Sequence, residues 1–341
     1  MAEYFGKLPN GGQAMLYTIG SSELKIQVSD LGATLVGVET KDREGAFVDV
    51  SLGFRQAEKY LTEDGCIGAS VGRNANRIGG SQFFLNGERV KLEANEGTNS
   101  LHSGPDVWYH RLWKVLSSCE NAITFGLDTP HMDQGFPGGG KVQVTYEVSG
   151  TALRITYQGT FERDTVFNMT NHSYFNLAGQ DKPEAAMEQL LCVRASRYTQ
   201  VDRTSIPTGE ILPVEGTALD FRRPKALGRN RDQDPLLAPQ RGIDHNLVLD
   251  VAAFDVPAAK LYSPMTGISM TVFTDCPGIQ IYCANFLDTV GKDGVHYGPN
   301  CAVCLETQFA PDSMNHPQWP QPVVKAGQCA QSVTEFHFGV E

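Results

Sequence analysis

Three polar stretches, far apart in the sequence, contain the residues most suited to chemistry. Glu306 lies at the centre of residues 304–308, an extended run that ends at a proline-containing loop. Side chains alternate between the two faces of a strand, so Glu306 and Gln308 share one face. A carboxylate held on a stiff strand just before a loop can act as a base. A lone strand glutamate is more often simply exposed, so the interpretation depends on two further stretches, which contain His102 and His172.

The stretch around His172 is the richest in polar side chains. In an extended conformation, one face would hold Asn168, Thr170, His172, Tyr174 and Asn176. Five hydrogen-bonding side chains are costly to bury without partners, so we expect them to line a polar cleft.

Two other segments offer groups that could bind hydroxyls. Residues 72–80 have glycines at both ends and contain Asn76 and Arg77, whose guanidinium carries five fixed donors. The alternative interpretation is a solvated loop with one structural arginine. Asp244 precedes the apolar residues 247–249 and could accept hydrogen bonds from vicinal hydroxyls, although an aspartate that caps a turn is equally common.

One motif resembles a phosphate-binding loop. Residues 135–141 have the glycine and lysine spacing of such a loop, but Val142 stands where serine or threonine would bind magnesium. A strand pattern follows in place of a helix, so there is no helix N-terminus to bind phosphate. We interpret these residues as a glycine turn that enters a hairpin.

A second motif, Cys301-Ala-Val-Cys304, resembles a metal or redox pair. On a strand, residues three apart point to opposite faces, so the two sulfurs could not easily share a zinc ion. We expect two buried cysteines that behave as small hydrophobic residues. The sequence therefore predicts no metal site and no cofactor.

The elements expected to position these residues are strands. Val142 to Val148 and Leu153 to Tyr157 alternate around Gly150 and predict a hairpin with one buried face. Further strand candidates are residues 24–28, 33–39, 122–127, 268–273, 279–283 and 333–338. Only residues 55–61 and 183–190 suggest short helices. This pattern predicts an all-β sandwich of antiparallel strands. We expect residues 1–341 to form a single domain, with residues 222–240 as a long surface excursion.

The composition indicates which kinds of binding partner and which cellular compartment to expect. The net charge of −11 argues against nucleic acid or an anionic membrane as a partner and is compatible with neutral small molecules. No apolar run approaches the ~20 residues that span a bilayer, and residues 1–10 lack the apolar core of a signal peptide. The eight scattered cysteines favour reduced thiols, so we expect a cytoplasmic protein.

Taken in order, the polar stretches resemble the motifs of the aldose 1-epimerase (galactose mutarotase) family. The matching motifs are Gly72-Arg-Asn-Ala-Asn-Arg-Ile78, Asn99-Ser-Leu-His102, Gly135-Phe-Pro-Gly138, Asn171-His-Ser-Tyr-Phe-Asn-Leu177, Gly242-Ile-Asp-His245, Gly278-Ile-Gln-Ile-Tyr282, Asn285-Phe-Leu-Asp288 and Leu305-Glu-Thr-Gln308 with Pro311-Asp-Ser313 and Asn315-His-Pro317. Any one motif is weak evidence, whereas the ordered set is highly specific.

The resemblance implies a fold and a role for each site residue. It implies an antiparallel β-supersandwich with an open cleft, Glu306 as general base, His172 as general acid and His102 assisting. The implied substrate-binding residues are Asn76, Arg77, Ser173, Tyr174, Asp244 and Gln280. Small aldoses would be the only partners of a monomer or weak homodimer. The sequence departs from the family pattern at Phe309-Ala310 and Met314, which are expected to alter a loop near the site.

The implied reaction interconverts the α and β anomers of free hexoses such as glucose and galactose by opening and closing the ring. A base takes the proton of the C1 hydroxyl while an acid protonates the ring oxygen. We expect the pKa of Glu306 to be raised from ~4.3 by partial burial and those of the histidines to stay near ~6.5. Three alternatives remain open: a hexose-6-phosphate 1-epimerase, a non-catalytic sugar-binding module, and a glycoside hydrolase that uses Glu306 with Asp244.

Overall fold

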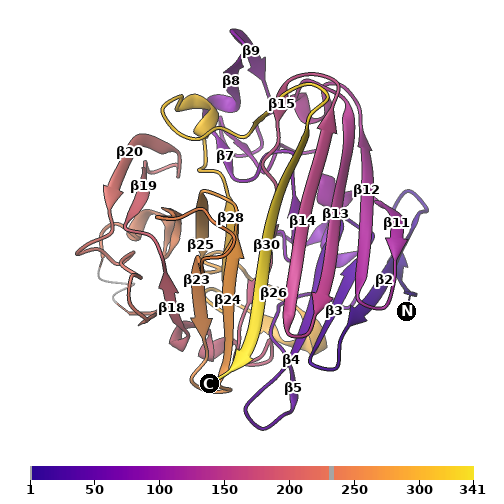
Figure 1. The fold of residues 1–341 in the computed structure, drawn as a ribbon, viewed down its shortest axis with the longest axis vertical. Helices are drawn as coiled ribbons and strands as arrows, with labels where there is room; N and C mark the ends of the chain where they lie inside the picture. Colours follow the sequence, from indigo (N-terminus) through magenta and orange to yellow (C-terminus); the bar gives the residue numbers. More distant parts are fainter. Residues whose placement is uncertain (1, 230–233) are drawn as a thin grey trace.

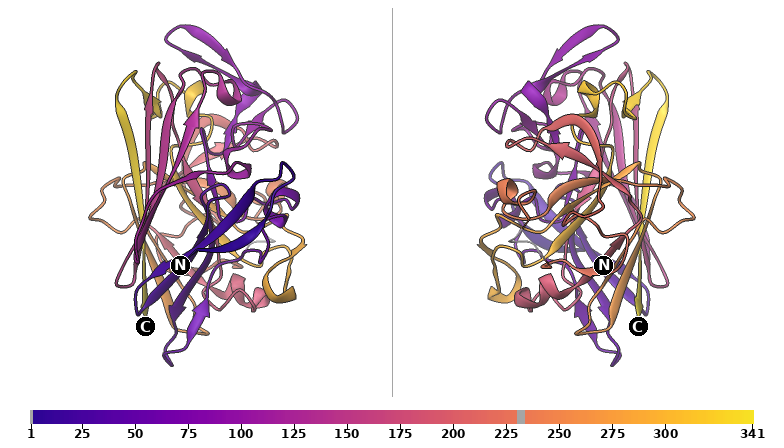
Figure 2. Two further views of the ribbon diagram at one scale, coloured as in Figure 1. Left: turned by 90° about the vertical axis from the view of Figure 1, so that its right-hand side faces the viewer. Right: turned by 90° about the vertical axis from the view of Figure 1, so that its left-hand side faces the viewer.

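The computed structural model describes residues 2–229 and 234–341, and these residues fold mainly into antiparallel sheets (Figure 1). The nine-stranded sheet is the largest. In spatial order it contains β11 (Lys114–Ser118), β12 (Ala122–Thr129), β13 (Gly140–Ser149), β14 (Ala152–Phe161), β30 (Cys329–Val340), β24 (Ile268–Thr274), β23 (Ala259–Tyr262), β18 (Leu190–Val193) and β21 (Lys225–Ala226). Figure 2 shows its long strands along one side of the molecule, with most of the remaining chain on the other side.

A six-stranded sheet carries the predicted base. Its spatial order is β17 (Tyr174–Phe175), β28 (Val303–Gln308), β25 (Gly278–Tyr282), β22 (Asp244–Val248), β19 (Arg197–Val201) and β20 (Pro207–Pro213). All six residues of β28 are buried, because this strand lies inside the sheet and both of its faces are covered. Glu306 is therefore buried by the fold rather than placed at an exposed edge.

The N-terminal part of the chain forms a five-stranded sheet of β1 (Ala2–Lys7), β2 (Gln13–Gly20), β3 (Leu24–Ser29), β4 (Thr34–Lys41) and β5 (Phe47–Asp49). Five two-stranded ladders complete the strands. They join β6 (Ala69–Val71) to β16 (Thr170–His172), β7 (Arg77–Ile78) to β10 (Ser100–Leu101), β8 (Gln82–Leu85) to β9 (Glu88–Lys91), β15 (Thr165–Val166) to β29 (Val323–Val324) and β26 (Thr289–Val290) to β27 (His296–Tyr297). Two of these ladders, β6–β16 and β7–β10, carry predicted site residues.

One large apolar cluster joins the three main sheets. It includes Ile26 of β3, Tyr146 of β13, Leu153 of β14, Ile281 of β25 and Leu305 of β28, all of which are buried. The predicted hairpin is confirmed, since β13 and β14 pair in register from Gly140–Phe161 to Ser149–Ala152. The alternating apolar residues of β13 point into this cluster, as the period of two requires.

The two predicted helices are much shorter than expected. Only Lys59–Thr62 (α1) forms an α-helical turn within residues 55–61, and Pro183–Glu188 is a 3-10 helix. Neither stretch is long enough to gain from cooperative propagation of an α-helix, and 3-10 geometry is common in such short pieces. The all-β class is confirmed despite this correction.

The segment 222–240 is only partly an excursion. Its residues 230–233 lie outside the described part of the chain, while β21 pairs with β18 at one edge of the nine-stranded sheet. The glycine turn at residues 135–141 is as predicted, since Gly135 and Gly138 have positive φ angles and β13 begins at Gly140. In the residues that the structure describes, no helix has the length and apolar character needed to cross a membrane.

Candidate active site

A cavity of about 670 Å³ opens over one face of the six-stranded sheet. Its walls come from several segments, including residues 62–66, the β7–β10 ladder, β16, β17 and the loop that precedes β26. Seven of the nine residues predicted for the site line this cavity, and Ser173 and Gln280 do not. The seven residues are Asn76, Arg77, His102, His172, Tyr174, Asp244 and Glu306.

The register of the sheet places the polar residues of three strands side by side. Glu306 of β28 lies opposite Gln280 of β25, which lies opposite Asn246 of β22. Two residues further along each strand, the same face presents Cys304, Tyr282 and Asp244 in a second row. Glu306, the predicted base, and Asp244, predicted to bind hydroxyls, therefore share one surface because of strand pairing.

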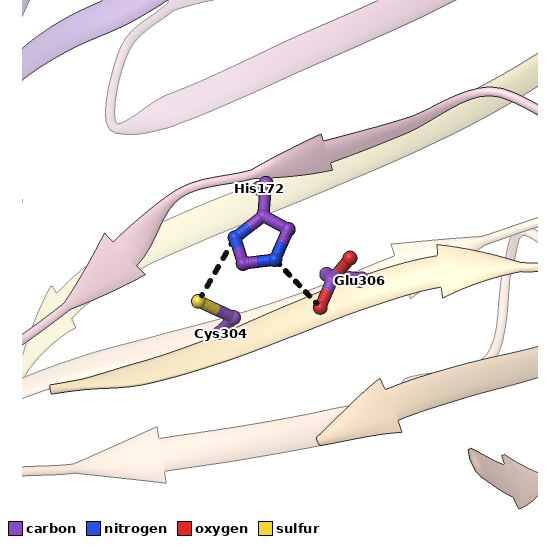
Figure 3. Close-up of side chains that lie close together, drawn as sticks. All are labelled: His172, Cys304 and Glu306. Carbon is purple, nitrogen blue, oxygen red and sulfur yellow. Dashed lines mark hydrogen bonds and ion pairs between the residues drawn. The ribbon is translucent and has the colours of Figure 1, made fainter. Parts of the chain in front are cut away.

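His172 reaches Glu306 from β16, which packs against β28. Its Nε2 lies 3.6 Å from Oε1 of Glu306, and its Nδ1 lies 3.5 Å from Sγ of Cys304 (Figure 3). Glu306 is only 2% exposed, and its second oxygen, Oε2, has no hydrogen-bond partner within the described protein. The two candidate proton-transfer groups thus face each other at the base of the cavity.

Burial favours the neutral form of both groups. It raises the pKa of Glu306 well above its usual value, and the charge of Asp244 adds to this effect while Arg77 opposes it. Burial also lowers the pKa of His172 to about 4, against the smaller raising effects of its own backbone carbonyl and of Asp244. The pKa of Glu306 is thus raised, as the sequence analysis predicts. The expectation of histidine pKa values near neutrality was wrong, because desolvation of the imidazolium dominates.

His102 is held by a reciprocal pair of hydrogen bonds with Asn76. The backbone N–H of Asn76 donates to Nδ1 of His102 at 3.1 Å, and the backbone N–H of His102 donates to the carbonyl of Asn76 at 3.0 Å. Nδ1 is therefore an acceptor, so the neutral ring carries its proton on Nε2. Burial, followed by the nearby His172 and Arg77, lowers the pKa of His102 well below its usual value. His102 is consequently a neutral donor.

Arg77 lies between two carboxylates. Its Nε and Nη2 donate to Glu96 at 2.6 and 2.8 Å, a bidentate arrangement that fixes the plane of the guanidinium. Its Nη1 lies 3.8 Å from Oδ2 of Asp244, whose Oδ1 accepts a 2.6 Å hydrogen bond from Nε2 of Gln280. Gln280 itself does not line the cavity, so its contact orients Asp244.

The backbone around His172 is less regular than the sequence pattern predicts. Tyr174 lines the cavity, but Oγ of Ser173 donates to Asn171 at 2.5 Å and Ser173 does not line it. Asn168 accepts from the backbone of Phe309, and Asn176 donates to the carbonyl of Lys182. The expected five-residue polar face is therefore wrong. His172 and Tyr174 still share the cavity face on either side of Ser173, while Asn168 and Asn176, at the two ends of the stretch, bind backbone groups.

Sequence reasoning missed three residues of the site. Glu96 fixes Arg77, Tyr282 packs against the His172 ring with centroids 5.9 Å apart, and Cys304 contacts Nδ1 of His172. The period of two along β25 and β28 could have placed Tyr282 with Gln280 and Cys304 with Glu306. No local signal points to Glu96, since its partner is 19 residues away. Cys301 and Cys304 are both buried as expected, but Cys304 is also a polar neighbour.

The two departures from the family motifs do not face the cavity. Met314 packs in an apolar cluster with Ile78, Phe83 and Phe136, and Phe309 and Ala310 are absent from the cavity walls. The same loop nevertheless supports the site. The backbone N–H of Asp312 donates to the carbonyl of Arg77, and its carboxylate accepts from the N–H of Gly79.

One trio of side chains in the described part of the chain brings metal-ligand types close together. Ligand atoms of His172, Cys304 and Glu306 all lie within 4.8 Å of one another. However, the two ring nitrogens of His172 face different partners, Nδ1 towards the sulfur and Nε2 towards the carboxylate (Figure 3). A metal ion shared by all three residues would therefore require the imidazole ring to turn from this orientation.

Comparisons with known proteins agree with this geometry. The family model described as aldose 1-epimerase matches residues 15–337. The chain is 39% identical to galactose mutarotase of Sus scrofa, over 98% of this chain and 97% of the relative, and 33% identical to aldose 1-epimerase of Escherichia coli over the same shares. A solved aldose epimerase homologue from C. elegans superposes with a TM-score of 0.86 at 28% identity, covering 95% of this chain and 99% of the other. The chain therefore belongs to the aldose 1-epimerase family.

Proposed function

We propose that this protein interconverts the α and β anomers of free aldohexoses, with galactose and glucose as the first substrates to test. One observation carries the proposal: Oε1 of Glu306 and Nε2 of His172 lie 3.6 Å apart at the base of a cavity of about 670 Å³. The C1 hydroxyl and the ring oxygen of a pyranose are bonded to the same carbon. An acid and a base that serve these two oxygens must therefore be close neighbours.

Ring opening needs one proton to leave and one to arrive. Glu306 takes the proton of the C1 hydroxyl as the C1–O5 bond breaks, and Nε2 of His172 gives a proton to O5. The aldehyde then rotates about the C1–C2 bond, and O5 adds to its other face. During closure, His172 takes the proton back from O5 and Glu306 returns one to O1, so the enzyme ends in its starting state.

The pair needs one proton in total for this cycle. In the free enzyme, burial raises the pKa of Glu306 and lowers that of His172, so the shared proton rests on the carboxyl group. Transfer of this proton to Nε2 of His172 creates the carboxylate and imidazolium that the reaction uses. The protons of such a coupled pair belong to the pair rather than to either residue.

The remaining residues of the cavity hold and orient the sugar. Glu96 fixes the guanidinium of Arg77, and Nη1 of Arg77 faces the carboxylate of Asp244. This N–H donor and this carboxylate acceptor together match two vicinal hydroxyls of a sugar. His102 offers its Nε2–H as a neutral donor, beside the side chain of Asn76. Ser173 and Gln280 support Asn171 and Asp244 rather than the sugar itself.

The charge of the cavity separates free sugars from phosphorylated ones. Six carboxylates line it, those of Glu63, Asp64, Glu96, Asp244, Asp288 and Glu306. Among the described lining residues, Arg77 is the only arginine or lysine, and Glu96 already pairs with it. We expect kcat/KM for a hexose 6-phosphate to be at least about tenfold lower than for the free hexose, because like charges in contact cost several kcal/mol.

Polarimetry tests the proposal directly. Freshly dissolved α-D-galactose and α-D-glucose should reach their equilibrium rotation faster with the protein than in matched buffer. No acceleration for any aldose would leave a non-catalytic sugar-binding module, which equilibrium binding of galactose would then identify. Equal or higher kcat/KM for the 6-phosphate would favour the hexose-6-phosphate epimerase instead.

The single domain, the cytoplasmic location and the oligomeric state also remain proposals. The apolar cluster shared by the three main sheets supports a single domain over residues 1–341. No disulfide joins any of the cysteines in the described residues, which supports a reducing compartment such as the cytoplasm. The oligomeric state, monomer or weak homodimer, is a matter for sedimentation or light scattering.

A further inference from the structure

Cys304 packs in a buried apolar cluster, but its sulfur also has a polar neighbour that packing does not require. It is fully buried and does not line the cavity, yet its sulfur lies 3.5 Å from Nδ1 of His172 (Figure 3). Burial raises the pKa of its thiol well above the usual value, so the sulfur is neutral. A neutral sulfur can accept a weak hydrogen bond from a ring N–H.

The surroundings of His172 leave its ring little freedom. Its centroid lies 5.1 Å from that of Tyr174, 5.5 Å from that of His102 and 5.9 Å from that of Tyr282. Cys304 is the strand partner of both tyrosines, so its sulfur lies on the floor between them. The three rings restrict the plane of the imidazole, and the sulfur and the carboxylate distinguish its two nitrogens.

The carboxyl group on the other side decides which nitrogen carries the permanent proton. When the shared proton is on Glu306, this carboxyl faces Nε2 across 3.6 Å, a contact that favours a bare Nε2 and a hydrogen on Nδ1. When the proton has moved to the ring, both nitrogens carry hydrogen. In both states Nδ1 would then carry a hydrogen towards the sulfur, which lies 3.5 Å away.

We propose that Cys304 is a positioning residue whose sulfur accepts the Nδ1–H of His172 throughout the cycle, so that Nε2 remains the nitrogen that exchanges its proton with the sugar ring oxygen. This inference rests on the proposed function, since it names the atom through which His172 acts. A carboxylate in this position would stabilise the imidazolium strongly, as it does in hydrolytic triads. An uncharged sulfur fixes the tautomer without that stabilisation, so the ring releases its Nε2 proton readily.

Nitrogen NMR of the full-length wild-type protein tests the tautomer without any change to the contact. The His172 signals are identified by their loss in a His172→Asn variant. The expected result at neutral pH is a protonated Nδ1 and an unprotonated Nε2. A protonated Nε2 with a bare Nδ1 would overturn the proposal, whatever the variants of Cys304 do.

Variants of two neighbouring cysteines supply the kinetic test. Cys304→Ala should lower kcat about 10- to 100-fold, the usual cost of losing a partner that orients a functional histidine, with little change in KM. Cys304→Ser retains an acceptor and should recover most of the lost kcat. Cys301→Ala is the matched control, because Cys301 is buried in the same apolar cluster and has no hydrogen bond to His172 in the described chain.

The outcomes separate the two proposals. Equal kcat for Cys304→Ala and Cys301→Ala, or a fall in kcat with an unchanged tautomer at His172, would overturn the positioning role. A wild-type protein that accelerates no mutarotation refutes the proposed function instead, and the NMR measurement still decides whether the sulfur accepts the Nδ1–H.

Discussion

Replacement of Glu306 by glutamine is the most informative single change, because it removes the base and almost nothing else. Glutamine has the same shape, and Oε2 of Glu306 has no hydrogen-bond partner within the described protein, so an amide at that position breaks no existing bond. An amide cannot take the proton of the C1 hydroxyl. Proton-transfer groups contribute about 10²–10⁴ in rate, and water cannot easily replace a group that is 2% exposed. We therefore expect kcat to fall about 10³-fold, which corresponds to about 4 kcal/mol.

The same substitution should stabilise the folded protein at neutral and alkaline pH. Burial raises the pKa of Glu306, so the folded state holds a proton that the unfolded chain releases above its own pKa. This contribution makes wild-type stability decrease as the pH rises from about 4.5 towards the pKa of the folded state. Glutamine does not titrate, so Glu306→Gln should have the higher Tm at pH 8. Loss of activity together with a gain in stability distinguishes a catalytic residue from a structural one.

Polarimetry with fresh α-D-galactose measures kcat and KM, and thermal unfolding between pH 5 and pH 8 measures stability. Asp64→Asn is the control, since Asp64 is an exposed carboxylate on the wall of the same cavity. It should retain kcat within about twofold, because this exposed side chain neither transfers a proton in the proposed reaction nor orients a residue that does. The reasoning fails if Glu306→Gln keeps more than a tenth of the wild-type kcat.

Three further changes probe binding and stability. Arg77→Ala should raise KM for galactose by about tenfold or more and change kcat much less, because a charge-assisted hydrogen bond contributes about 1.5–3 kcal/mol. A change in kcat alone would contradict a role in positioning the sugar. Burial lowers the pKa of His245 to about 4. Between about pH 4 and 6.5 the imidazole is therefore protonated in the unfolded chain and neutral in the folded protein, so the free energy of unfolding falls as the pH drops through this range. His245→Asn should remove about 3 kcal/mol of this pH dependence in urea unfolding, and an unchanged slope would refute the assignment. Lys292 is fully buried with its Nζ 2.7 Å from Asp49, so Lys292→Met should destabilise the fold by about 3–5 kcal/mol in the same assay, and a loss below about 1 kcal/mol would show that the pair matters little.

Several features of this protein follow from local sequence. Alternation of apolar and polar residues predicts the β13–β14 hairpin and most of the long strands, since burial of one face requires a period of two. The same rule places Cys304, Glu306 and Gln308 on one face of β28. Glycine at positions with positive φ marks the turn before β13. The ordered polar motifs identify the family and name both His172 and Glu306 before any geometry is known.

Local patterns fail where an element is short or where the pairing partner changes. The two expected helices reduce to a four-residue α-helical turn and a six-residue 3-10 helix, and the pairing partner changes between β16 and β17. Asn168 and Asn176 are equally polar, but they bind backbone groups of Phe309 and Lys182. Composition cannot distinguish a side chain that binds a substrate from one that binds its own backbone.

The sequence by itself determined the strand periodicity, the family and the identity of the proposed acid and base. Only the tertiary structure decided that β16 lies over β28, that Glu96 fixes Arg77 and that a cysteine faces Nδ1 of His172. It also decided the directions of the two pKa shifts, upwards for Glu306 and downwards for His172. The physical reason is that desolvation depends on everything packed around a group, and most of those neighbours are distant in sequence.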